Sequence, residues 1–174
     1  KFVAPIRKVL PFPTVFNLLG PIVNPSQPKC QLLGVANLDQ MRLYNNVYRK
    51  IGIDYAIENS IEGYDEISLT GNFKITTNDY ERIFSPADIG MQQTQASELM
   101  GGETKEDAMR IFDSVLANTA TESQKNVVIT NAAFAIQVME RGKKSIDECI
   151  AIARESLESG RAEETLKKFI EINS

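Results

Sequence analysis

The chain has 174 residues, of which 43% are hydrophobic and 24% charged, a composition typical of a globular domain that can bury a sizeable core. Its net charge of −4, with Arg7-Lys8 and Lys143-Lys144 only as isolated basic pairs, argues against a nucleic-acid-binding surface. The chain contains no histidine, which excludes imidazole acid–base catalysis and the usual zinc ligand sets, and no apolar run is long enough to span a bilayer.

The first elements predicted along the chain are two short helical segments, at residues 1–10 and 15–19. A Gly-Pro and an Asn-Pro dipeptide follow within "NLLGPIVNP" at residues 17–25. Each proline fixes its own φ and moves the residue before it out of the helical region. The sequence therefore predicts a rigid corner ahead of the first strand.

The next segment predicts a strand, a helix and a second strand. "QLLGVA" at residues 31–36 is a continuous apolar run of strand length, residues 38–52 form an amphipathic helix ended by glycine, and "DYAIENS" occupies residues 54–60. The apolar face of the helix is predicted to contain Met41, Tyr44, Val47, Tyr48 and Ile51. Such a unit implies a parallel pair of strands with a right-handed crossover.

Between residues 66 and 84 the apolar period changes to two. The runs at residues 66–70, 73–79 and 80–84 alternate, and Gly71-Asn72 separates the first two. We therefore expect antiparallel hairpin strands that extend the sheet, with a turn at Gly71-Asn72.

The last third of the chain is predicted to be helical. Capping-box patterns begin at Thr104, Thr121 and Ser145. A helix over residues 122–141 is apolar on nearly every side and should be central, whereas the last segment is expected to pack Leu166, Phe169 and Ile170. Together the elements predict the α/β class, with a mostly parallel sheet, an antiparallel hairpin extension and flanking helices.

Two places in the sequence carry candidate binding chemistry. Asp65 and Glu66 are adjacent carboxylates after a glycine, and Mg²⁺ is commonly held by one or two carboxylates together with substrate phosphates. Arg7 lies among apolar neighbours, where a guanidinium can bind a carboxylate or phosphate in a bidentate manner. The alternatives are an exposed acidic turn and an arginine that extends its charged group into water.

Several quoted motifs resemble the anthranilate phosphoribosyltransferase family. They are "VAPIRK", "TVFNLLGPIVNP" and "QLLGVA", then "GYDEISLTG", "SPADIGM", "ELMGGETKEDAMRIFDSVL" and "NVVITNAAFAIQVMERG", in the order of the family and over nearly the whole chain. The resemblance implies an enzyme of tryptophan biosynthesis that joins anthranilate to phosphoribosyl pyrophosphate. It also implies a nucleoside phosphorylase/phosphoribosyltransferase-like C-terminal domain.

The resemblance also implies roles for individual residues. Arg7 corresponds to the arginine that contacts the anthranilate carboxylate, and Asp65 and Glu66 correspond to the carboxylates that hold Mg²⁺ on the pyrophosphate. No nucleophilic residue is required, so no catalytic side chain is assigned. One departure is that Pro11-Phe12-Pro13-Thr14 stands where the family has Gly-x-Arg-Thr, so a second family arginine is replaced by proline.

The resemblance implies that residues 1–174 are the C-terminal part of the α/β domain. The N-terminal helical domain and the Gly-rich phosphate loop of the family are missing, so we expect this stretch alone to be inactive and the full-length protein to be a homodimer. Cys30 and Cys149 are far apart in sequence and expected to be reduced, which together with the lack of a signal peptide favours the cytoplasm.

Two other functions are compatible with the same fold. A pyrimidine nucleoside phosphorylase would bind a related ribosyl substrate, and a paralogue without catalytic activity would only bind a ligand or nucleic acid. The pattern of Arg7 with Asp65 and Glu66 disfavours the phosphorylase. The negative net charge and the intact Asp-Glu pair disfavour the binding paralogue.

Overall fold

The structure is a computed structural model that describes residues 15–174. It contains a four-stranded sheet in the order β1-β2-β3-β4. The strands are β1 (Cys30–Gly34), β2 (Asp54–Ser60), β3 (Phe73–Thr77) and β4 (Glu81–Phe84). β1 and β2 are parallel, whereas β3 and β4 continue the sheet in antiparallel pairs. The predicted α/β class is confirmed, and the sheet within the described residues is mixed.

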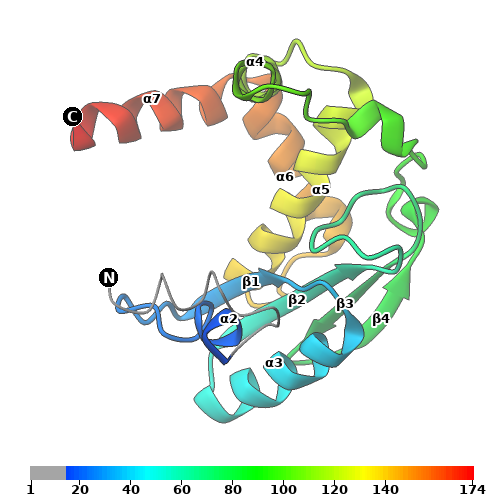
Figure 1. The fold of residues 1–174 in the computed structure, drawn as a ribbon, viewed down its shortest axis with the longest axis vertical. Coiled ribbons are helices and arrows are strands. Elements are labelled where there is room, and N and C mark those ends of the chain that lie inside the picture. The colour runs from blue at the N-terminus through cyan, green and yellow to red at the C-terminus, as the bar shows by residue number, and fades with distance from the viewer. Residues whose placement is uncertain (1–14) are drawn as a thin grey trace.

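Helices cover both faces of this sheet (Figure 1). α3 (Leu38–Ile51) crosses one face between β1 and β2, while α5 (Glu122–Met139) covers the other and α6 (Ile146–Glu158) packs against α5. The remaining helical elements are α2 (Val15–Leu19), η1 (Pro86–Ile89), η2 (Ala96–Leu99), α4 (Lys105–Leu116) and α7 (Arg161–Asn173). Because side chains alternate along a strand, the two faces of β2 belong to separate apolar clusters, with Ile57 on the α3 side and Ala56 on the α5 side.

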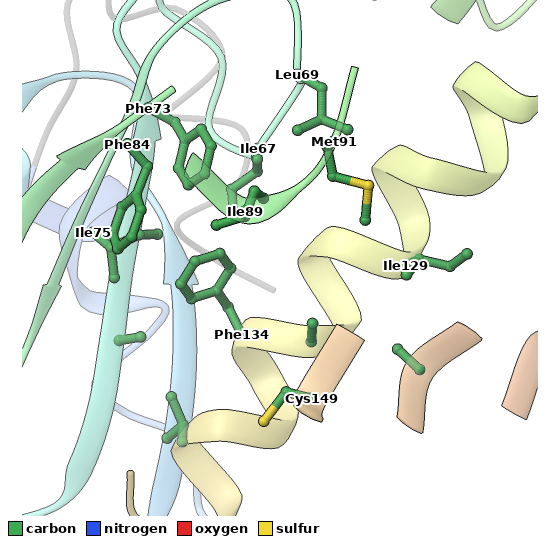
Figure 2. Packing of buried hydrophobic residues seen from close by; sticks show 14 of the residues in the cluster. Ile67, Leu69, Phe73, Ile75, Phe84, Ile89, Met91, Ile129, Phe134 and Cys149 are labelled. Atoms are coloured by element: carbon green, nitrogen blue, oxygen red, sulfur yellow. The ribbon is translucent and has the colours of Figure 1, made fainter. Parts of the chain in front are cut away.

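The larger cluster is built around three aromatic rings (Figure 2). Phe134 of α5 makes edge-to-face contacts with Phe73 and Phe84, with ring centroids 5.9 and 5.8 Å away. The two strand residues stack on each other at 5.6 Å. Such pairs add to the burial energy of the rings, so the central position predicted for α5 is confirmed.

Three helices begin directly after the residues at which the capping-box patterns predicted a start. The side chains of Thr104, Thr121 and Ser145 each accept a hydrogen bond from the backbone N–H three residues later. Gly52 ends α3 with φ of 77°, a left-handed conformation that favours glycine. The proline-containing corner is held against α3, because the Tyr44 hydroxyl donates to the Leu18 carbonyl at 2.8 Å.

Three predictions about local structure after β2 were wrong. Residues 66–70 form a loop instead of a strand, with residues 67–70 buried, and Leu69 has a positive φ of 58°, which no regular strand accommodates. The hairpin turn therefore lies between β3 and β4, at residues 78–80, instead of at Gly71-Asn72. On α7, Phe169 and Ile170 are 65% and 54% exposed, so they do not pack as expected.

Cys30 and Cys149 form no disulfide, as predicted, and Cys149 is fully buried in the larger cluster. Among the described residues, no helix is both long and apolar enough to cross a membrane.

Candidate functional site

The candidate site lies where the parallel strands β1 and β2 end. The carboxyl ends of parallel strands meet at one edge of a sheet, where the loops that follow them form most ligand sites of α/β folds. Residues 61–72 form the loop after β2 and contain Asp65 and Glu66, whose side chains are both exposed. The sequence placed this pair at the start of a strand, whereas the structure places it in the loop.

Gly34 allows this loop to approach the sheet closely. A Cβ atom at this position would overlap the carbonyl oxygen of Asp65, so the backbone of Asp65 occupies the space of a side chain. Any larger residue at position 34 must therefore displace the loop. A glycine with this role is typical of sites where two backbone segments touch.

Hydrogen bonds from the end of β2 hold the loop in place. The Ser60 hydroxyl donates to the Glu66 carbonyl at 2.7 Å, and the Ser60 N–H donates to the Tyr64 carbonyl at 3.0 Å. The buried Asn59 amide bridges β1 and the loop, since it donates to the carbonyls of Val35 at 2.7 Å and Tyr64 at 3.3 Å. Both flanks of the Asp65–Glu66 pair are thus fixed to the sheet.

Asn131 of α5 holds the loop from the other side. Its side-chain oxygen accepts from the Ile67 N–H at 3.1 Å, and its amide group donates to the Ile67 carbonyl at 2.8 Å. Ile67 directly follows Glu66, so this double contact fixes the backbone beside the acidic pair. Since the loop satisfies its backbone groups with side chains, residues 66–70 do not need strand partners.

Glu58 of β2 is a third acid at this edge, and it is only 5% exposed. Its Oε2 atom has no hydrogen-bond partner within residues 15–174. Burial, followed by the negative charges of Glu66 and Asp65, raises the pKa of Glu58 to about 8. The negative charges of Glu66 and Asp65 therefore act on Glu58.

The raised pKa predicts that Glu58 makes the fold less stable as pH rises. The unfolded chain loses this proton near pH 4.5 and the folded chain only near pH 8, so the folded state holds more protons between these values. The free energy of unfolding should fall across this window by on the order of 5 kcal/mol through this group. We expect Glu58→Gln to remove this loss.

Urea unfolding of the wild type and Glu58→Gln at pH 4.5 and pH 8.5, in metal-free buffer, measures the effect. The variant should differ little from the wild type at the lower pH and be clearly more stable at the higher pH. A difference in stability that does not change with pH would contradict the burial of an ionisable Glu58.

The loop offers the ligand type that hard cations prefer. Asp65 and Glu66 supply exposed carboxylate oxygens, and Mg²⁺ takes oxygen ligands while keeping several waters. Within residues 15–174, no three acidic, histidine or cysteine side chains converge closely enough to hold an ion together. The arrangement therefore fits a cation bound by two carboxylates, with the other positions left for water or phosphate oxygens.

Arg7 lies outside the described residues, so the structure does not relate it to Asp65 and Glu66. Sequence reasoning missed the residues that hold the acidic loop: Gly34, Glu58, Asn59 and Asn131. Two of them had a visible signal, because Glu58 is a charge within a buried strand and Asn131 is a polar residue within an apolar helix.

Comparison with known proteins gives consistent matches. The family described as glycosyl transferase family, a/b domain, matches residues 1–163. The anthranilate phosphoribosyltransferase of Phocaeicola vulgatus is 58% identical over 174 residues, which cover 100% of this chain and 52% of the relative. That of Cytophaga hutchinsonii is 47% identical over 170 residues, which cover 98% of this chain and 52% of the relative. The chain thus spans about half the length of these curated relatives.

Solved structures show the same fold. The anthranilate phosphoribosyltransferase of Thermus thermophilus matches with a TM-score of 0.87 and 27% identity, covering 97% of this chain and 50% of that chain. The Saccharomyces cerevisiae enzyme in complex with PRPP and Mg matches with a TM-score of 0.83 and 27% identity, covering 97% and 48%. The same yeast enzyme has also been solved in complex with 4-fluoroanthranilate, with a TM-score of 0.86, 27% identity and coverage of 97% and 50%.

Proposed function

Because the chain belongs to the glycosyl transferase family, whose a/b domain it contains, we propose that the protein transfers a phosphoribosyl group from phosphoribosyl pyrophosphate to the amine of anthranilate. The observation that carries this proposal is the acidic loop, held at the carboxyl edge of the sheet by Gly34, Asn59 and Asn131. The relatives and solved structures named above are all anthranilate phosphoribosyltransferases, which favours the transferase over a nucleoside phosphorylase.

We infer that Asp65 and Glu66 hold the Mg²⁺ ion on the pyrophosphate. The yeast structure with PRPP and Mg supports the choice of cation for the family. The exposed carboxylates and the phosphate oxygens together supply the oxygen ligands that this ion requires. When bound, Mg²⁺ neutralises the charge that develops on the leaving pyrophosphate.

The reaction needs placement and charge stabilisation more than covalent help. The amine nitrogen of anthranilate forms a bond to C1 of the ribose while the bond from C1 to the pyrophosphate oxygen breaks, and the transition state has oxocarbenium character. The amine then loses a proton. Rigid attachment of the loop to β2 and α5 keeps Asp65 and Glu66 in place without reorganisation during the reaction.

We further propose that this chain forms the C-terminal part of the α/β domain and that the full-length protein is a homodimer in the cytoplasm. The match of the a/b domain model to residues 1–163 supports the assignment to an α/β domain, and the coverage of about half of each relative agrees with a part of a longer protein. The remaining part of the phosphate site then lies in the other half of the protein. Residues 1–174 expressed alone should accordingly bind substrates weakly and show no turnover.

Arg7 is the residue that we expect to bind the anthranilate carboxylate. In the full chain encoded by the gene, Arg7→Ala should raise the KM for anthranilate by about tenfold or more, because a charge-assisted bidentate contact is lost. The KM for phosphoribosyl pyrophosphate should change little. Loss of anthranilate fluorescence in the presence of phosphoribosyl pyrophosphate and Mg²⁺ measures both constants.

The same assay tests the proposed function. Mg²⁺-dependent loss of fluorescence in the wild type supports the transferase. If the wild type leaves anthranilate unchanged but cleaves thymidine in the presence of phosphate, the phosphorylase is the correct function. Lys8→Ala, at the next residue, is the matched control for removal of a positive charge, and its KM values should stay near those of the wild type.

A further inference from the structure

Glu58 is a buried acid that has no neutralising partner among residues 15–174. The influences on its pKa, other than burial, are the two acids Glu66 and Asp65. Its Oε2 atom lacks a hydrogen bond among the described residues. A buried carboxylate without a partner costs free energy, and an apolar residue of similar size would cost less in the middle of a sheet. Packing alone therefore does not explain why a glutamate occupies position 58.

The strand register places Glu58 directly behind the acidic loop. Gly34 of β1 lies opposite Glu58 of β2. Both face α5, because Leu32 and Ala56, two residues earlier on the same strands, pack in the α5-side cluster. The carbonyl of Asp65 occupies the space above Gly34, so the loop backbone lies next to the Glu58 side chain. The acid thus approaches the Asp65–Glu66 pair from the interior.

We propose that Glu58 is a positioning residue of the proposed magnesium site, which acts on the cation from behind Asp65 and Glu66 through the water that the ion retains. This inference rests on the proposed function, which places Mg²⁺ in the loop. Two carboxylates leave most positions of the ion to water and phosphate, and waters bound to a cation donate hydrogen bonds to nearby carboxylates. A cation above Glu58 would also favour the ionised form of this carboxyl, whose Oε2 atom has no hydrogen-bond partner within residues 15–174.

Binding of Mn²⁺ alone to the full-length protein tests this proposal, with free Mn²⁺ measured by electron paramagnetic resonance at pH 8.5. Loss of an outer-sphere partner typically weakens metal binding by a factor of 10 to 100, so we expect Glu58→Gln to raise the Kd for Mn²⁺ by about tenfold. Glu58→Asp keeps the charge and should retain most of the affinity. Glu62→Gln, an exposed acid of the same loop, is the matched control and should change the Kd less than twofold.

Each outcome separates the inference from the proposed function. If the wild type binds Mn²⁺ and Glu58→Gln binds it equally well, the role of Glu58 is wrong while the metal site stands. If both Gln variants weaken binding to the same extent, the effect is general electrostatics and Glu58 has no special role. If the wild type does not bind Mn²⁺ at all, the metal site of the proposed function fails and the inference fails with it.

Thermal unfolding without metal shows whether weaker Mn²⁺ binding could come from a less stable variant. Glu58→Gln should be at least as stable as the wild type at pH 8.5, so weaker Mn²⁺ binding cannot come from unfolding. A variant that is both less stable and weaker in binding would indicate a structural role and overturn the proposal.

Discussion

Replacing either carboxylate of the acidic loop should remove most of the activity. We expect Asp65→Asn and Glu66→Gln to lower kcat/KM by about 100-fold or more, since electrostatic stabilisation of a leaving group commonly contributes a factor of this size. Both side chains are exposed, so the substitutions leave the core unchanged and the fold should stay intact. Raising the Mg²⁺ concentration should restore part of the activity, because the defect is in cation affinity.

The dependence of the initial rate on Mg²⁺ concentration is the measurement that checks this prediction. Asp39→Asn is the matched control, because Asp39 is an exposed acid on α3 whose only ion pair within the described part of the chain, with Arg42 at 3.6 Å, lies in the same helix. The control should keep the wild-type profile. A wild-type Mg²⁺ profile in Asp65→Asn and in Glu66→Gln would show that the loop does not hold the cation.

The second large effect is expected from a single methyl group at position 34. Gly34→Ala places a Cβ where the carbonyl of Asp65 lies, and a backbone atom cannot move aside as a flexible side chain does. The loop must shift away from β1, which misplaces Asp65 and Glu66. We expect kcat/KM to fall by about 100-fold, since displacement of a positioned group by about 1 Å costs that much.

Thermal unfolding and the Mg²⁺ profile together check the Gly34 prediction. The melting temperature should fall by a few degrees, because an overlap with backbone atoms costs about 1–3 kcal/mol. Gly101→Ala is the matched control, since a Cβ at Gly101 would meet no atom within 4 Å. Normal activity in Gly34→Ala would mean that the loop does not need its close contact with β1.

Patterns that depend on neighbours in sequence predicted the fold well. The helix starts at Thr121 and Ser145 were correct because a capping box is complete within four residues. The strand at residues 54–60 was predicted at its observed bounds, and the parallel pairing with β1 followed from the strand–helix–strand unit.

Patterns that depend on distant residues could not be predicted from the sequence. The alternation at residues 66–70 predicted a strand, but Asn131 and Ser60 satisfy the backbone groups of this segment, and the positive φ of Leu69 breaks the strand. Ile51 was expected on the buried face of α3 but is 51% exposed, because α3 ends at that residue. The role of Gly34 depends on a loop thirty residues later, which no local pattern reveals.

The position of a bound cation decides whether Asp65 and Glu66 hold the metal ion on the pyrophosphate. Crystals of the full-length protein grown with Mn²⁺ and phosphoribosyl pyrophosphate would locate the ion from its anomalous scattering. We expect an anomalous peak at the loop after β2, within coordination distance of a carboxylate oxygen of Asp65 or Glu66 and of the pyrophosphate. A bound pyrophosphate whose Mn²⁺ lies elsewhere, with both carboxylates free, would contradict it.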